Sequence, residues 1–248
     1  TLDGTLFPYT TLFRSHYEIG WDPKTPTRVE DDQGKALAFQ WAPPKVYSGN
    51  RNVLVAQVPV PAFGYRQIRV RADPAAGPAV AHGRAEGNVL ENEHLRVTFQ
   101  PSGTIGIMDK DAGRDVFQAP GARAVVIDDP HDSWANVKAF DKEIGTFGNA
   151  RTSVVEEGPL RRVLRMRTTY GSSTLTIDWI LYAGSRTLEA EVALDWREQR
   201  KMLKLSFPVD VVQPQATCEV PYGHIVRATN GNEEPGLRWI DVTGTRET

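Results

Sequence analysis

The stretch from Asn88 to Phe117 constrains the fold most, because its two-residue hydrophobic period, interrupted by turn signals, predicts β-strands. Apolar residues alternate with polar ones before a turn signal at 101–103, and the same period resumes after it (Leu95, Val97 and Phe99, then Ile105 and Ile107). A second turn is expected at 109–113. Strands with one apolar and one polar face are typical of antiparallel sheets that cover a core on one side. We therefore expect this stretch to be the opening meander of a sheet domain.

The second half of the chain continues this pattern. Residues 124–127 are typical of a buried strand, and three long strands with turn signals at 171–173 and 183–185 follow. A further strand is expected over 203–209, where Pro208 indicates a sheet edge or a bulge. The shared apolar faces of the three long strands are Leu164, Met166 and Tyr170; Leu175, Ile177, Trp179 and Leu181; and Leu188, Ala190, Val192, Leu194 and Trp196.

The opposite faces of these strands carry charges of both signs. Arg165 and Arg167 lie on the first strand, and Glu189, Glu191 and Asp195 lie on the third. We expect cross-strand pairs there, each contributing from a few tenths to about 1 kcal/mol.

The first part of the chain predicts a smaller unit. Between residues 16 and 70, short strands are separated by Pro and Gly, and the Pro- and Gly-rich segment 73–79 is the natural linker. We expect an all-β protein in which a small β-sandwich domain (16–77) precedes a large antiparallel β-sandwich domain (78–248). Residues 1–15 have no consistent period, and Thr5 to Ser15 resembles a translated sequencing adapter, so this segment is expected to be an artefact or a disordered tail.

Charge and composition exclude several classes of partner. The 248 residues include 29 basic and 31 acidic side chains, a formal net charge of −2, which predicts no nucleic acid and no anionic membrane as partner. No run approaches the roughly 20 apolar residues that span a bilayer. The single cysteine, Cys218, excludes an internal disulfide and a cysteine-rich zinc site. A reducing, cytoplasmic location is expected, although many exported bacterial proteins share this composition.

Two loops carry the candidate binding residues. The polar loop at 128–134 ends in Trp134, and the stretch from Tyr222 to Trp239 combines aromatic and polar groups around a Gly-flanked loop. Such mixtures are typical of ligand pockets. The alternative is that Trp134, Tyr222 and Trp239 are core aromatics under ordinary loops. The substrate-facing candidates are Trp134, Tyr222, His224, Asn230, Glu233 and Glu234.

The residues indicate no catalytic centre and no metal site. Acid–base chemistry by two carboxyl groups requires both to face one reacting bond, and the adjacent pairs Asp128-Asp129 and Glu233-Glu234 are candidates by composition alone. The pair His131-Asp132 gives too few metal ligands. We expect His94 to be a surface residue on a strand, and Cys218 has no adjacent His to activate it.

Five motifs in order resemble the C-terminal β-sandwich of glycoside hydrolase family 38, the bacterial α-mannosidases. They are Leu90 to Phe99 with Pro101 to Ile105, Asp128 to Trp134, Leu203 to Pro208, Pro221 to Ile225, and Asn230 to Gly236 followed by Trp239. The resemblance implies a galactose mutarotase-like supersandwich. It also implies that the intact enzyme is a zinc-dependent, retaining exo-mannosidase whose zinc ligands and nucleophilic Asp lie on an N-terminal domain.

Two functions follow from these observations. In the first, the chain is an inactive, C-terminally truncated fragment of an α-mannosidase that supports the catalytic domain, shapes its sugar pocket and holds no cofactor itself. In the second, it is a free-standing carbohydrate-binding or mutarotase-like module, in which His224 with Glu219 or Glu233 would act as acid and base.

Overall fold

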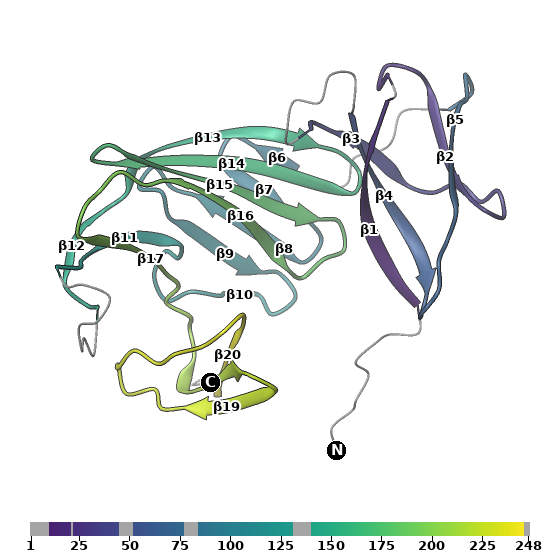
Figure 1. The fold of residues 1–248 in the computed structure, drawn as a ribbon. Coiled ribbons are helices and arrows are strands. Elements are labelled where there is room, and N and C mark those ends of the chain that lie inside the picture. Colours follow the sequence, from purple (N-terminus) through teal and green to yellow (C-terminus); the bar gives the residue numbers. More distant parts are fainter. Residues whose placement is uncertain (1–9, 21, 45–51, 77–83, 131–139, 246–248) are drawn as a thin grey trace. The chain divides into compact units, whose positions relative to one another are not determined.

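The computed structural model describes residues 10–20, 22–44, 52–76, 84–130 and 140–245. These residues form β-strands and connecting turns, and no helix occurs among them, which confirms the all-β antiparallel prediction (Figure 1). The described part of the chain accordingly offers no helix long and apolar enough to cross a membrane. The chain divides into two compact units: unit 1 is residues 1–94, 153–165 and 178–191, and unit 2 is residues 95–152, 166–177 and 192–248.

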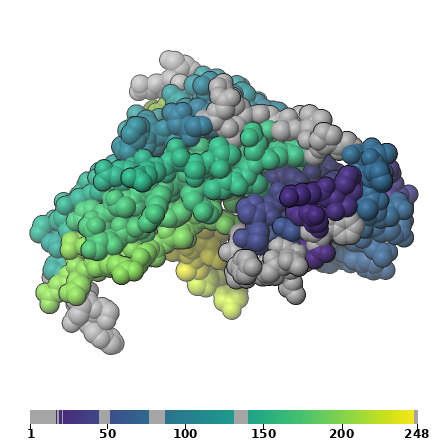
Figure 2. Space-filling view, turned by 90° about the horizontal axis from the view of Figure 1, so that it is seen from above, coloured from purple at the N-terminus to yellow at the C-terminus, as the bar shows by residue number. Residues whose placement is uncertain are grey.

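Unit 1 begins with two small antiparallel sheets. The first has the order β1-β4-β3, formed by Thr10–Ile19, Asn52–Pro61 and Phe39–Ala42, and the second pairs β2 (Thr27–Asp31) with β5 (Ile68–Ala72). Strand β4 supplies the core of this region, because Leu54, Val55 and Ala56 are fully buried. The space-filling view shows these purple and blue segments closely packed (Figure 2).

Two prolines occur within the central strand of the first sheet. Pro59 and Pro61 pair with β1, whereas the pairing with β3 ends at Ala56, so neither proline interrupts a two-sided ladder. Residues Thr10 to Ser15 belong to β1, which lies at the edge of this sheet. The start of the adapter-like segment lies outside the described residues, and its origin stays a prediction.

The predicted meander is confirmed. A five-stranded antiparallel sheet has the order β10-β9-β8-β7-β6, and its central pair keeps the register from Leu95↔Asp109 to Phe99↔Ile105. Gly103 makes the turn between β8 and β9 with a φ of +85°, a left-handed conformation that favours glycine. The strands are Arg84–Glu86 (β6), Val89–Glu91 (β7), Leu95–Phe99 (β8), Ile105–Asp109 (β9) and Arg114–Asp115 (β10).

The predicted boundary between the domains, at 77 and 78, lies outside the described residues. His94 precedes β8 and is half-buried, so its placement on a strand was wrong.

The three long strands are confirmed within a four-stranded sheet of order β13-β14-β15-β16, formed by Gly148–Glu157, Arg161–Tyr170, Ser173–Tyr182 and Leu188–Asp195. The predicted apolar face of β15 is buried along its length. On β16 the expected core face was wrong, because Val192 is 51% exposed and Leu194 is 42% exposed. Strand β16 is an edge strand, and the described residues leave this face uncovered.

The strand order separates the first and third strands, between which charge pairs were predicted. Strand β15 lies between β14 and β16, so the guanidinium of Arg165 meets Asp178 of β15 instead, with two hydrogen bonds of 2.7 Å. Asp195 pairs with Arg197 in its own segment. The sequence identified charged faces but not the order of the strands.

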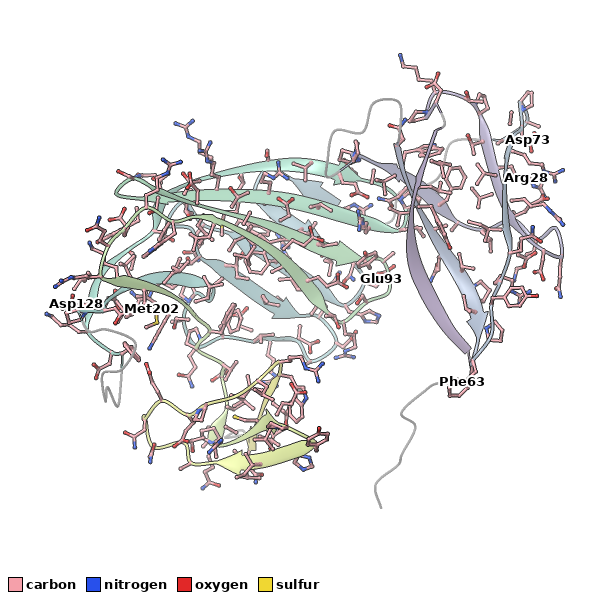
Figure 3. The ribbon with its side chains drawn as sticks, viewed as in Figure 1. Arg28, Phe63, Asp73, Glu93, Asp128 and Met202 are labelled. Atoms are coloured by element: carbon pink, nitrogen blue, oxygen red, sulfur yellow. The ribbon has the colours of Figure 1, made fainter. Side chains whose placement is uncertain are left out.

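A three-stranded sheet in unit 2 has the order β12-β11-β17, formed by Glu143–Thr146, Arg123–Asp128 and Lys201–Ser206. The predicted position of the last strand at an edge is confirmed, although β17 ends before Pro208. Figure 3 shows Asp128 and Met202 close together where the end of β11 lies beside the start of β17, and Ile127 pairs with Met202. Asp128 accepts a 2.7 Å hydrogen bond from Lys142, which gives it a structural partner.

A buried polar cluster in unit 1 joins segments far apart in sequence. The side-chain oxygen of Gln40 accepts hydrogen bonds from the backbone N–H groups of Leu160 (2.8 Å) and Arg161 (2.9 Å). Its Nε2 donates to the Arg161 carbonyl and to Glu156. Arg161 completes the cluster by donating from Nη1 to the hydroxyl of Tyr182 at 3.0 Å. All these polar groups are therefore satisfied in the protein interior.

Candidate functional site

The predicted site lies on a three-stranded sheet in unit 2, with the order β19-β18-β20. The strands are Val212–Val220 (β18), Gly223–Arg227 (β19) and Ile240–Thr245 (β20), which confirms two strands around a loop at 228–239. A rigid sheet that carries a long polar loop is a common arrangement for binding residues.

Glu219 fastens the end of the loop to β18. Its carboxylate accepts hydrogen bonds from the Arg238 guanidinium at 2.6 Å and from the Arg238 backbone N–H at 2.8 Å. These hydrogen bonds, the side-chain one foremost, hold the pKa of Glu219 below its usual value. The backbone of Leu237 also donates to the Glu219 carbonyl. The residue that follows Arg238, Trp239, is thereby held in place.

His224 and Trp239 form the aromatic part of the site. Their ring centroids are 6.4 Å apart with a tilt of 41°, and Trp239 is 45% exposed. Tyr222 lies in the two-residue turn between β18 and β19 with a φ of +66°, so it does not share a strand face with His224. The Tyr222 side chain is fully exposed. In the described structure neither Tyr222 nor Trp239 is therefore a core aromatic.

The polar candidates of the loop have partners within unit 2. Glu233 forms an ion pair with Lys204 of β17, and Glu234 lies 3.6 Å from Arg227 of β19. The Asn230 side-chain oxygen accepts a hydrogen bond from the Asn232 backbone N–H at 3.0 Å. These contacts order the loop, and the structure brings Glu233 and Glu234 to separate cations rather than to one another.

Apolar side chains are exposed on the same sheet and loop. They come from the turn, from both outer strands and from the end of the loop: Tyr222, Ile225, Val226, Leu237, Trp239 and Ile240. Exposed apolar side chains that gather on one element occur at interaction sites more often than on ordinary protein surface. The arrangement can therefore support stacking against a flat apolar face and packing against another protein surface.

The pair proposed for a mutarotase-like module is present, but its chemistry is unfavourable. Glu219 and His224 are direct partners in the register of β18 and β19. Because Arg238 holds the pKa of Glu219 low, its carboxylate is a weak base for proton abstraction. The arrangement favours a structural role for Glu219.

Sequence reasoning missed Arg238 and Lys204, which hold Glu219 and Glu233. Arg238 stands next to the candidate Trp239, and this was the one hint in the sequence that Arg238 belongs to the site. No spacing rule, however, pairs residue 238 with residue 219. Trp134, His131 and Asp132 lie outside the described residues. Among the residues the structure describes, no three His, Cys, Asp or Glu side chains gather as metal ligands would.

Comparison with known families and proteins gives a consistent result. The family model "Glycosyl hydrolases family 38 C-terminal domain" matches residues 90–246. Alpha-mannosidase 2C1 of Mus musculus is 28% identical over 211 residues, which covers 76% of this chain and 20% of that protein. Alpha-mannosidase G of Dictyostelium discoideum is 25% identical over 189 residues, covering 66% of this chain and 17% of that protein. The chain thus spans about a fifth of the length of the curated relatives it matches.

Solved structures agree on the fold. A glycosyl hydrolase family 38 protein from Enterococcus faecalis aligns with a TM-score of 0.65 and 15% identity, over 89% of this chain and 34% of that chain. An alpha-mannosidase from Enterococcus faecalis V583 aligns with a TM-score of 0.62 and 15% identity, over 88% and 32%. At this identity the likeness concerns the fold alone.

Proposed function

We propose, because the chain belongs to glycosyl hydrolase family 38, that it is the C-terminal β-sandwich part of an α-mannosidase, which hydrolyses terminal α-mannosides. The observation that carries the proposal is the family match over residues 90–246, together with the likeness to two proteins named as alpha-mannosidases. In this proposal the chain consists of a small β-sandwich domain at 16–77 and a large β-sandwich domain at 78–248.

The chain's role in that enzyme is to support the catalytic domain and to shape its sugar pocket. The segment from Tyr222 to Trp239 faces the catalytic domain in this proposal. Its support is the number of large apolar side chains that are exposed on β19, β20 and the loop and that a second protein surface would cover. The ordered loop contacts of Glu233 and Arg238 provide the rigidity that a binding surface needs.

Two properties of Tyr222 support a role in the sugar pocket: its positive φ and its full exposure. A bulky residue with positive φ is strained, and such strain is concentrated at functional sites. An exposed aromatic ring can stack on the C–H face of a sugar, while nearby polar groups bind hydroxyls. The substrate-facing residues are Trp134, Tyr222, His224, Asn230, Glu233 and Glu234.

Zinc does not fit the described residues, because they bring no cluster of three ligands together. No catalytic step is assigned to this chain, and the zinc of the intact enzyme is proposed to lie on its N-terminal domain. Mannose-containing carbohydrate and the catalytic domain of the same protein are the proposed partners, and a cytoplasmic location stays a prediction.

Two experiments test the proposal. The purified chain should not hydrolyse an aryl α-mannoside, with or without added zinc, and turnover by the chain alone would refute the scaffold role. In the full-length enzyme, Tyr222→Ala, His224→Ala and Glu234→Gln should each lower kcat/KM at least tenfold, about 1.4 kcal/mol, with an unchanged melting temperature. The matched control is Tyr65→Ala, which removes another exposed aromatic side chain, in unit 1. Equal activity of all variants would return the loop to a purely structural role.

A further inference from the structure

A cavity of about 440 Å³ lies in unit 1 and is lined by residues of β13, β14, β15 and β16 and of the segment that follows β3. One part of its lining is apolar: Pro43, Pro44, Val155, Val163 and Ile180. This volume lies within the roughly 300–1,000 Å³ typical of small-molecule sites. The cavity belongs to neither the loop at 228–239 nor the sheet that carries it.

The floor of the cavity holds a buried ion pair. Glu156 and Arg161 are 8% and 7% exposed, and Arg161 donates to the carboxylate from Nε at 2.9 Å and from Nη2 at 2.8 Å. Gln40 and Tyr182 bind the same pair and fix its orientation. A pre-oriented polar floor costs little reorganisation when a ligand enters.

The rim carries a second pair and a third carboxylate. Asp178 accepts one hydrogen bond on each oxygen from Arg165, and its side chain is 20% exposed. Each carboxylate oxygen has two lone pairs, so Asp178 can accept further hydrogen bonds from a ligand. Glu191 lines the same cavity. Three carboxylates and two guanidinium groups give the lining a net charge of −1, which disfavours anionic ligands.

We propose that this cavity binds one neutral hexopyranose unit of a carbohydrate. A pyranose has a C–H face and a rim of hydroxyl donors. The C–H face would pack on Pro43, Val163 and Ile180, and the hydroxyls would donate to Asp178 and Glu191. The choice of an α-mannoside as the ligand rests on the proposed function, whereas the site itself rests on the cavity and its polar groups.

The test is binding to the isolated chain, measured by NMR on ¹⁵N-labelled protein. Titration with methyl α-mannoside should shift the Nε–H signals of Arg161 and Arg165, with a dissociation constant in the millimolar range typical of single sugars. Asp178→Asn keeps the side-chain shape and should weaken binding at least tenfold. The matched control is Asp195→Asn, which removes an exposed, arginine-paired carboxylate outside the cavity and should leave binding unchanged. Glu156→Gln is unsuitable, because it leaves a buried guanidinium without its carboxylate.

A second sugar separates this inference from the proposed function. If methyl β-galactoside binds as well as the mannoside and Asp178→Asn weakens both, the sugar site is supported while its selectivity for mannose is overturned. If neither sugar shifts the arginine signals, or if Asp195→Asn weakens binding as much as Asp178→Asn, the site is overturned. Neither result depends on turnover by the full-length enzyme, which tests the proposed function alone.

Discussion

Arg161 and Glu156 meet through two hydrogen bonds, Nε to Oε1 at 2.9 Å and Nη2 to Oε2 at 2.8 Å, with both side chains buried. Removing one partner of such a pair leaves a charge in a poorly solvated environment. Glu156→Gln should therefore lower the free energy of unfolding by about 3 to 5 kcal/mol, measured by urea denaturation.

The control for this prediction is Asp195→Asn, because the Asp195–Arg197 pair is exposed on both sides. Its loss should cost no more than about 1 kcal/mol. Equal effects of the two substitutions would mean that the buried pair contributes no more than a surface pair.

Replacing Arg162, the neighbour of Arg161, should stabilise the protein, whereas replacing Glu156 should destabilise it. Arg162 is 2% exposed, its Nε and Nη2 have no hydrogen-bond partner in the described structure, and its Nε lies 3.7 Å from the Glu157 carboxylate. Burial lowers its pKa, which reflects the cost of the charge there. Arg162→Met should raise the free energy of unfolding by about 1 kcal/mol in urea denaturation. A marked loss of stability would show that Arg162 contributes attraction that its contacts do not reveal.

Gly103 and Gly113 allow backbone strain to be separated from crowding. Both have positive φ, but a Cβ on Gly103 would lie 2.7 Å from Cγ2 of Thr168, whereas a Cβ on Gly113 would meet nothing within 4 Å. Gly113→Ala should cost about 1 kcal/mol and Gly103→Ala about 2 to 3 kcal/mol, measured by thermal and urea denaturation. Equal costs would indicate that Thr168 moves aside freely.

The hydrogen bonds of Arg238 to Glu219 predict an acid-sensitive C-terminal sheet. The pKa of Glu219 is lowered in the folded protein, so its contribution to stability is fully present above its usual value of 4.5 and is lost as pH falls through the folded pKa. Glu219→Gln should be less stable than the wild type at about pH 6, and the difference should shrink toward about pH 3. Melting curves at several pH values provide the measurement, and a gap that stays constant with pH would contradict the assignment.

The sequence predicted the elements whose pattern is local. The meander of β8, β9 and β10 and the buried face of β15 follow from a two-residue period that each segment carries by itself. Strands β12 and β13 were missed, since Gly148–Glu157 is largely exposed and its apolar residues are sparse.

The rest depended on relationships between segments. Burial of Val192 and Leu194 depends on what covers an edge strand, and the pairing of Arg165 with Asp178 depends on the order of the strands. In the candidate site, the exposed aromatic and acidic residues were identified from composition. Their partners Arg238 and Lys204 were not, because the loop path that brings them together is not encoded by spacing.

The hydrogen bonds of Gln40 to Leu160 and Arg161 also set the order in which the protein can complete its folding during synthesis. These bonds join residues 120 and 121 positions apart. At about 5–20 residues per second, translation of the intervening segment takes roughly 6 to 24 seconds. During that interval the side-chain amide of Gln40 lacks these two native partners, although strands β1, β3 and β4 have already been synthesised. Strands β1, β3 and β4 therefore gain the hydrogen bonds of this cluster only after residues 160 and 161 emerge, so the region around Gln40 completes its packing late.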